Sequence, residues 1–97
     1  MVRKYNDQTL GEVIREMLSQ YRLEGKLSQA RLIEAWPEVT GPMIAKHTRD
    51  IYIKGRTLYV KVDSPALKNE LSYSRSQILS SLNETVGEEI VTEIVFR

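Results

Sequence analysis

The chain has 97 residues, of which 41% are hydrophobic, and a net charge of +1, which suits one small domain with a single core. The absence of cysteine excludes disulfide bonds and thiolate chemistry. No apolar run reaches the roughly 18 residues of a membrane helix, and the first residues lack the apolar core of a signal peptide. We expect one cytoplasmic domain over 1–97, with 1–6 as a flexible end and no membrane contact.

Apolar residues at helical spacing predict a first helix in the N-terminal part of the chain. Its apolar stripe consists of Leu10, Val13, Ile14, Met17, Leu18 and Tyr21. Asp7 is one candidate N-cap, and Thr9 with Glu12 matches a capping box as a second candidate. Gly25 suits the end of this helix or the turn that follows it.

A second helix is expected to start at Ser28, with Leu27 and Leu32 as a hydrophobic staple around the cap. Pro37 should end this helix near Trp36, because the residue before a proline disfavours helical geometry. The second helix is therefore predicted to be short.

A short helix from Pro42 to Lys46 is expected next, since proline is tolerated in a first helical turn. Alternation with a period of two then predicts a β-hairpin with its turn at Gly55-Arg56. One face of the hairpin is aliphatic and consists of Ile51, Ile53, Leu58, Val60 and Val62. The other face carries Tyr52, Lys54, Tyr59 and Lys61.

Ser64, followed by Pro65, predicts the start of a long helix after the hairpin, and Gly87 suits its end. The apolar arc of this helix consists of Leu67, Leu71, Ile78 and Leu82, widened by Leu79 and Val86. Ile90–Phe96 is typical of a third strand in a central or partly covered position, because apolar residues lie on both of its faces. The predicted fold class is α+β: N-terminal helices, a β-hairpin, a long helix and a third strand, with the helices on one side of a three-stranded sheet.

The sequence offers little catalytic chemistry. It has no glycine-rich phosphate loop, and one histidine without cysteine cannot build a usual zinc site. His47 is the one candidate base for a serine nucleophile, but a single histidine among several serines is expected by chance. We therefore expect no enzymatic activity, no cofactor, no metal and no small-molecule substrate.

Trp36 and His47 each have a structural and a functional interpretation. Trp36, the only tryptophan, is either a core anchor between helix and sheet or a hot spot for a protein partner. His47 either packs and hydrogen-bonds at the joint between helix and strand, or contacts a binding partner.

Charge is distributed unevenly along the chain. Residues 46–61 contain five cations against one aspartate, a balance of +4, whereas residues 83–97 contain four glutamates against one arginine, a balance of −3. Because aromatic rings stack on bases and cations meet phosphates, the first window predicts a nucleic-acid surface. Its residues are Lys46, Arg49, Tyr52, Lys54, Arg56, Tyr59 and Lys61. The alternatives are an ordinary solvated sheet face, and neutralisation of the hairpin charges by the C-terminal glutamates.

One ordered set of residues resembles a known family. The set begins with Trp36, Val39, Gly41, Ile44, Ala45, His47 and Thr48 and continues through Gly55, Leu58, Val60, Val62, Ser64, Glu70, Leu71, Ile78, Leu82, Asn83, Phe96 and Arg97. In order and spacing it is similar to the DciA-type family of bacterial proteins, and the likeness covers nearly the whole chain from Leu10.

The resemblance implies a domain similar to a type II KH fold and a role with the DnaB-type replicative helicase. A protein of this kind would help to load or activate the helicase on DNA and would not be an ATPase. From the charged window, with its few phosphate contacts and its two tyrosines, we expect weak binding that favours single-stranded DNA. Many family members carry an added basic or disordered extension, which we expect to be absent here, and a tryptophan early in the long helix, where this chain has Ala66-Leu67. The chain also lacks the Gly-x-x-Gly loop of KH domains. The alternative functions are a KH-like RNA-binding module and a protein-interaction domain without nucleic acid.

Overall fold

The computed structural model describes residues 9–14 and 23–97. Residues 10–14 are helical. The elements that follow are α3 (Leu23–Thr40), α4 (Pro42–Lys46), β1 (Thr48–Lys54), β2 (Thr57–Val62), α5 (Pro65–Ser72), α6 (Arg75–Val86) and β3 (Glu93–Phe96). The candidate cap Asp7, the stripe residues Met17, Leu18 and Tyr21, and the flexible end predicted for 1–6 lie outside the described residues.

The capping box predicted at Thr9 is present at the start of helix 10–14. The Thr9 N–H donates to Glu12 Oε1 over 2.9 Å, and the Glu12 N–H donates back to Thr9 Oγ1 over 3.1 Å. These reciprocal bonds satisfy two backbone donors that a helix start otherwise leaves free. Leu10 and Ile14 are 75% and 45% exposed, so these two residues of the apolar stripe have little cover from the described part of the chain.

Helix α3 begins earlier than the sequence indicates. Its first residue is Leu23, so Gly25 lies in its first turn rather than at a helix end, and Ser28 lies in its interior rather than at an N-cap. Ser28 is buried and donates to Glu88 Oε2 over 3.0 Å, while Leu27 is 53% exposed and forms no staple. The predicted start at Ser28 was wrong because its hydroxyl bonds a residue far along the chain, which local pattern cannot reveal.

Helix α3 also continues through Pro37 to Thr40, against the expected end near Trp36. Proline removes one backbone donor, but Trp36 is buried and Val39 is partly buried, so the core holds the helix on both sides of the proline. The Thr40 hydroxyl donates to the Trp36 carbonyl over 2.7 Å. Gly41 has a φ of +94°, a conformation that favours glycine, and it separates α3 from α4.

The strands form one sheet in the order β1-β2-β3. β1 and β2 are antiparallel and are joined by the predicted turn, in which Gly55 has a φ of +65°. β3 lies parallel to β2 at the edge of the sheet, so the central position was wrong, whereas the alternative of a partly covered strand holds, with Ile94 and Phe96 buried. The strand is also shorter than predicted, because the buried Val91 belongs to the segment that leads into it and not to the strand.

The predicted long helix is two helices, α5 and α6, separated by the turn residues Tyr73 and Ser74. Ser64 caps α5 as expected, accepting a hydrogen bond from the Leu67 N–H over 3.2 Å. An unbroken helix of this length would extend ~33 Å, well beyond a six-residue strand of ~20 Å. The break lets α5 pack against β2 and β3 while α6 packs against α3 and β3. Leu71 and Ile78, one from each helix, both reach the core.

The connection from α6 to β3 is held by one asparagine. Helix α6 ends at Gly87, as predicted, with a φ of +92° and a hydrogen bond from its N–H to the Asn83 carbonyl. The Asn83 Oδ1 accepts from the N–H groups of Ile90 and Val91 over 2.8 and 3.2 Å, and its Nδ2 donates to the Val91 carbonyl over 2.8 Å. These bonds turn the chain back toward the sheet.

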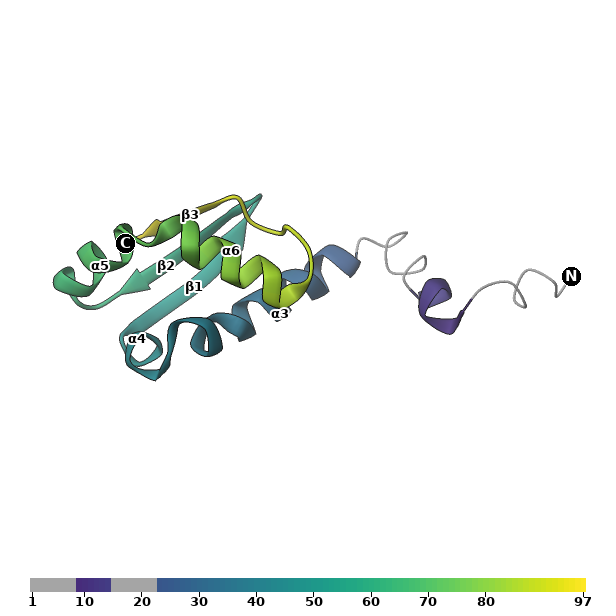
Figure 1. The fold of residues 1–97 in the computed structure, drawn as a ribbon, viewed down its shortest axis with the longest axis horizontal. Coiled ribbons are helices and arrows are strands. Elements are labelled where there is room, and N and C mark those ends of the chain that lie inside the picture. Colours follow the sequence, from purple (N-terminus) through teal and green to yellow (C-terminus); the bar gives the residue numbers. More distant parts are fainter. Residues whose placement is uncertain (1–8, 15–22) are drawn as a thin grey trace, which may run out of the picture.

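The described helices cover one face of the sheet, with α6 lying across the strands and α3 and α4 beside β1 (Figure 1). The core between the two layers consists of Leu32, Ala35, Trp36, Leu58, Val60, Val62, Leu71, Ile78, Leu82, Val86, Val91, Ile94 and Phe96. The fold class is therefore α+β, as predicted, and the order of elements is compatible with a KH type II-like domain. Among the described residues, no helix has the length and apolar character needed to cross a membrane.

Candidate nucleic-acid interface

The face of the sheet that faces away from the described helices is named the open face. It carries three rows of side chains, because residues directly opposite each other on paired strands point to the same side. From the hairpin end, the rows are Lys54–Thr57–Glu93, Tyr52–Tyr59–Val95 and Asp50–Lys61–Arg97. The open face therefore combines two tyrosines and three cations with two carboxylates.

Tyr52 and Tyr59 form the centre of the open face. Their rings stack with centroids 5.0 Å apart and planes inclined by 14°. The guanidinium carbon of Arg97 lies 5.7 Å from the centre of the Tyr52 ring, within cation–π range. Tyr52 is 36% exposed and its row neighbour Val95 is 37% exposed. The centre is thus an aromatic and apolar strip within reach of solvent, with cations at both ends.

The structure brings four of the seven predicted interface residues onto the open face. These are Tyr52, Lys54, Tyr59 and Lys61. Both lysines are exposed, and neither takes part in an ion pair within residues 9–14 and 23–97. Their charges are therefore not already neutralised by a described carboxylate in direct contact.

The other three predicted residues lie outside these rows. Lys46 ends α4, before the sheet begins. Arg49 lies at an irregularity of register near the start of β1 and forms an ion pair with Asp63. Arg56 lies in the hairpin turn and donates to both Oε1 and the backbone carbonyl of Glu89, each over 3.1 Å. The balance of +4 over 46–61 is therefore not the charge of one surface, and a C-terminal glutamate does neutralise the turn.

His47 belongs to a charged cluster at the joint between α4 and β1. Its Nδ1 lies 2.8 Å from Asp63 Oδ1, and the Arg49 guanidinium contacts the other oxygen of the same carboxylate. The hydrogen bond with His47 lowers the pKa of Asp63 below its usual value; partial burial opposes this shift and Arg49 adds to it. The Asp63 N–H also donates to the His47 carbonyl over 3.0 Å. The cluster therefore ties the start of β1 to the end of β2.

Trp36 is a core residue with only 2% of its surface exposed. Its Nε1–H donates to Thr48 Oγ1 over 3.0 Å, and the Thr48 hydroxyl donates in turn to the Ile44 carbonyl over 2.8 Å. Its ring lies 6.4 Å from that of Phe96, at an angle of 47°. These contacts join α3, α4, β1 and β3, and they leave almost none of the ring for a partner.

Several residues of the open face are absent from the interface predicted from sequence. They are Asp50, Thr57, Glu93, Val95 and Arg97. The alternation of side chains along the last strand could have placed Val95 and Arg97 on the face of the sheet that Ile94 and Phe96 do not occupy. The sequence does not show that β3 pairs with β2, and this pairing is what sets Arg97 beside Lys61.

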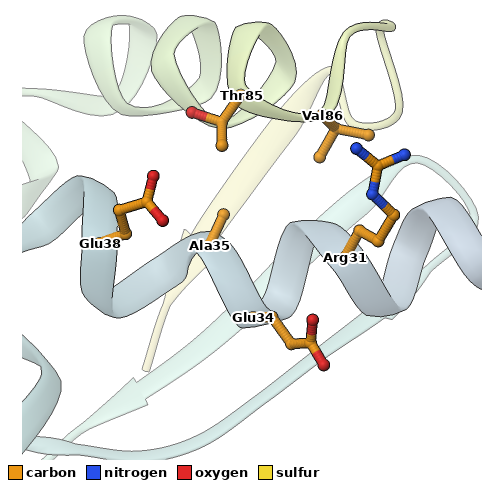
Figure 2. A pocket seen from close by; sticks show the side chains of 6 residues that line it. All are labelled: Arg31, Glu34, Ala35, Glu38, Thr85 and Val86. Atoms are coloured by element: carbon orange, nitrogen blue, oxygen red, sulfur yellow. The ribbon is translucent and has the colours of Figure 1, made fainter.

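A hollow on the helix side lies between α3 and α6 (Figure 2). Figure 2 shows Ala35 pointing toward α6, with Thr85 and Val86 opposite it and Arg31 and Glu38 at the rim. The small Ala35 side chain does not fill the space between the helices. This hollow does not extend the open face, which lies on the other side of the sheet. The described residues contain no group of three or more side chains suited to hold a metal ion.

The family model described as "Dna[CI] antecedent, DciA" matches residues 9–96. The chain therefore belongs to the DciA family, which confirms the resemblance found in the sequence.

Individual relatives cover most of this chain. A UPF0232 protein of Corynebacterium glutamicum is 31% identical over 87 residues, which are 90% of this chain and 49% of the relative. A UPF0232 protein of Mycobacterium ulcerans is 26% identical over 90% of this chain and 46% of its own length. In Mycolicibacterium smegmatis, the "UPF0232 protein in recF-gyrB intergenic region" is 26% identical over 90% of this chain and 45% of the relative. The chain thus spans about half the length of these relatives.

Proposed function

We propose that this chain is a DNA-replication accessory domain that binds single-stranded DNA weakly through the open face and acts with the DnaB-type replicative helicase. Membership of the DciA family supports the replication role. The resemblance to the family implies the association with the helicase, and the residues of the open face support the contact with DNA.

The observation that carries the DNA contact is the stacked pair of Tyr52 and Tyr59 between Lys54 at one end and Lys61 with Arg97 at the other. Stacking of one base on an aromatic side chain contributes about 1–3 kcal/mol and is tolerant of sequence. Lysine and arginine meet the phosphates on either side of the stacked base. A base that stacks on Tyr52 takes the place of the Arg97 guanidinium, which then turns to a phosphate.

The charges of the open face set the strength of binding. Three cations stand against Asp50 and Glu93, so the net charge of the face is +1. With at most three phosphate contacts, the logarithm of affinity should fall with the logarithm of salt concentration with a slope of about −2. Duplex DNA should bind less well than a single strand, because stacking needs unpaired bases.

The proposed role does not include ATP hydrolysis by this domain. Phosphoryl transfer needs groups that hold the phosphates and a metal ion, and the sequence has no glycine-rich loop of that kind. Energy for translocation would come from the helicase, while this domain would hold or present the single strand.

The test is fluorescence anisotropy with a labelled oligothymidine at two salt concentrations. The double variant Lys54→Glu with Lys61→Glu should lose at least tenfold in affinity, because two phosphate contacts become repulsive. The matched control is Lys26→Glu with Arg31→Glu, which makes the same change in net charge on exposed positions of α3. The control should keep most of the affinity of the parent.

Equal loss in the two double variants would mean that only net charge matters, and the open face would not be the binding surface. An RNA oligonucleotide of matching sequence separates this function from that of an RNA-binding module, which should prefer the RNA. Co-purification with the DnaB-type helicase tests the proposed association with the helicase. If immobilised protein does not retain the helicase, that association is wrong.

A further inference from the structure

The outer edge of β3 has no strand beside it within residues 9–14 and 23–97. On the inner side, Glu93 donates to the Arg56 carbonyl, and Arg97 donates to the Val60 carbonyl. Because the backbone groups of a strand alternate in direction, the N–H and C=O groups of Ile94 and Phe96 point outward. This edge can therefore hydrogen-bond one more extended chain.

Two cavities lie along this edge, on the side of the helices. The cavity toward the start of β3 is lined by residues that include Leu79, Asn83 and Val91, and by the carboxylates of Glu84 and Glu89. The cavity toward the end of β3 is lined by Lys68, Asn69, Ser72, Arg75 and Phe96, with Pro65. The two cavities adjoin along α6, because Ser76 lines the first and its neighbour Arg75 lines the second.

The cavities carry opposite charges. Among the described residues that line them, the cavity at the end of β3 has the cations Lys68 and Arg75 and no carboxylate. On the same count, the cavity at the start of β3 has Glu84 and Glu89 and no cation in its lining, although the Arg56 guanidinium contacts the Glu89 carboxylate. Of these four, only Glu89 takes part in an ion pair within the described residues, with Arg56. A polyanion along the whole edge would meet repulsion at the acidic cavity, so the pattern favours a ligand with both charges.

We propose that the β3 edge docks an extended segment of a partner protein, which adds as an antiparallel fourth strand with an acidic side chain near Phe96 and a basic side chain near Thr92. The backbone groups of Ile94 and Phe96 hold the main chain, as in other cases of strand addition. β3 begins at Glu93, and the N–H groups of Thr92 and Glu93 both donate to the Arg56 carbonyl, so Thr92 lies just outside the regular strand. On the added chain, the residue opposite Phe96 and the residue four positions further on, beside Thr92, lie about 13 Å apart and point to the same side. They therefore enter the cationic and the acidic cavity respectively.

The probe is a synthetic peptide, Val-Asp-Thr-Val-Thr-Lys-Val, in which aspartate and lysine occupy the positions opposite Phe96 and Thr92. One control peptide exchanges the aspartate and the lysine and keeps the composition. A second control is methylated on the backbone nitrogen of the central valine, which removes the donor opposite Ile94 and places a methyl group in the hydrogen-bonded edge. Binding is measured by NMR titration, and hydrogen exchange is followed at the amides of Ile94 and Phe96.

The matched peptide should slow exchange at Ile94 and Phe96, the exchanged peptide should bind about tenfold more weakly, and the methylated peptide should not bind. The variant Lys68→Glu with Arg75→Glu should lose the matched peptide, whereas Lys26→Glu with Arg31→Glu should retain it. The open-face variant Lys54→Glu with Lys61→Glu should also retain it, so this proposal and the proposed DNA contact fail independently.

Three results would overturn the proposal. The first is equal affinity for the matched and exchanged peptides, and the second is unchanged exchange at both edge amides in the presence of the matched peptide. The third is that an oligothymidine slows hydrogen exchange at the same two amides and displaces the peptide. That result would assign the β3 edge to nucleic-acid binding.

Discussion

The two faces of the sheet are built from the same three strands, and alternate residues of each strand belong to different faces. The faces differ in how far their side chains are buried. On the covered face, Leu58 and Val60 are fully buried and Phe96 is 6% exposed. On the open face, Tyr52 and Val95 are more than one-third exposed. The covered face therefore supplies the stability of the domain. The open face keeps an aromatic pair and cations at positions that the core does not need.

This difference has an energetic consequence. Removing a large buried side chain costs about 2–5 kcal/mol, whereas an aromatic pair adds about 0.5–1.5 kcal/mol beyond the area it buries. Substitutions on the covered side should therefore lower stability, and substitutions on the open face should change binding while the fold persists.

The largest effect is expected for Trp36→Ala. The ring is buried, packs near Phe96 and donates to Thr48, so its removal should lower the free energy of unfolding by about 3–5 kcal/mol. Chemical denaturation measures this change. The matched control is Tyr52→Ala on the open face, which should cost about 1 kcal/mol or less. Similar losses in the two variants would erase the distinction between the faces.

A smaller effect is expected for Asn83→Ala. This change removes three hydrogen bonds to Ile90 and Val91 and leaves the backbone of the buried Val91 without partners. The free energy of unfolding should fall by about 1–3 kcal/mol. Thr85→Ala is the control: its exposed hydroxyl bonds only a carbonyl of its own helix, so the cost should stay near 0.5 kcal/mol. Equal denaturation midpoints for the two variants would contradict this role of Asn83.

The smallest effect is expected for the pH dependence of the stability that Asp63 contributes. Because the folded-state pKa of Asp63 lies below its unfolded value, its contribution to stability is fully present above the ordinary carboxyl range and is lost as pH falls through the lowered pKa. The parent should therefore exceed Asp63→Asn in thermal midpoint near neutral pH, and this difference should shrink below about pH 5. A difference that stays constant down to pH 2 would show that the Asp63 carboxylate is not the cause.

The hairpin and the caps could be predicted because their signals are local. Alternation placed Tyr52, Lys54, Tyr59 and Lys61 on one face, and Ser64 was expected to cap a helix; the structure shows both. A period of two, or a hydroxyl just before a helix, needs no distant partner to be recognised.

The remaining features depend on distant contacts. The length of α3 depends on Trp36 and Val39 reaching a core that the sheet completes, which outweighs the local signal of Pro37. The break at Tyr73 depends on the dimensions of the sheet, which are set by other strands. The pairing of Arg49 with Asp63 and of Arg56 with Glu89 joins residues that no local pattern connects. The predicted charged window therefore included Arg49 and Arg56, which form ion pairs away from the open face.

The most direct test of the open face is an NMR titration of the isotope-labelled chain with a short oligothymidine at low salt. Binding at the open face should shift the amide signals of Thr57, Tyr59, Lys61 and Val95 and the ring signals of Tyr52, and raising the salt concentration should reverse these shifts. Shifts confined to α3, α5 and α6, with the central row of the open face unchanged, would show that the open face does not bind DNA and would place the DNA contact on the helix side.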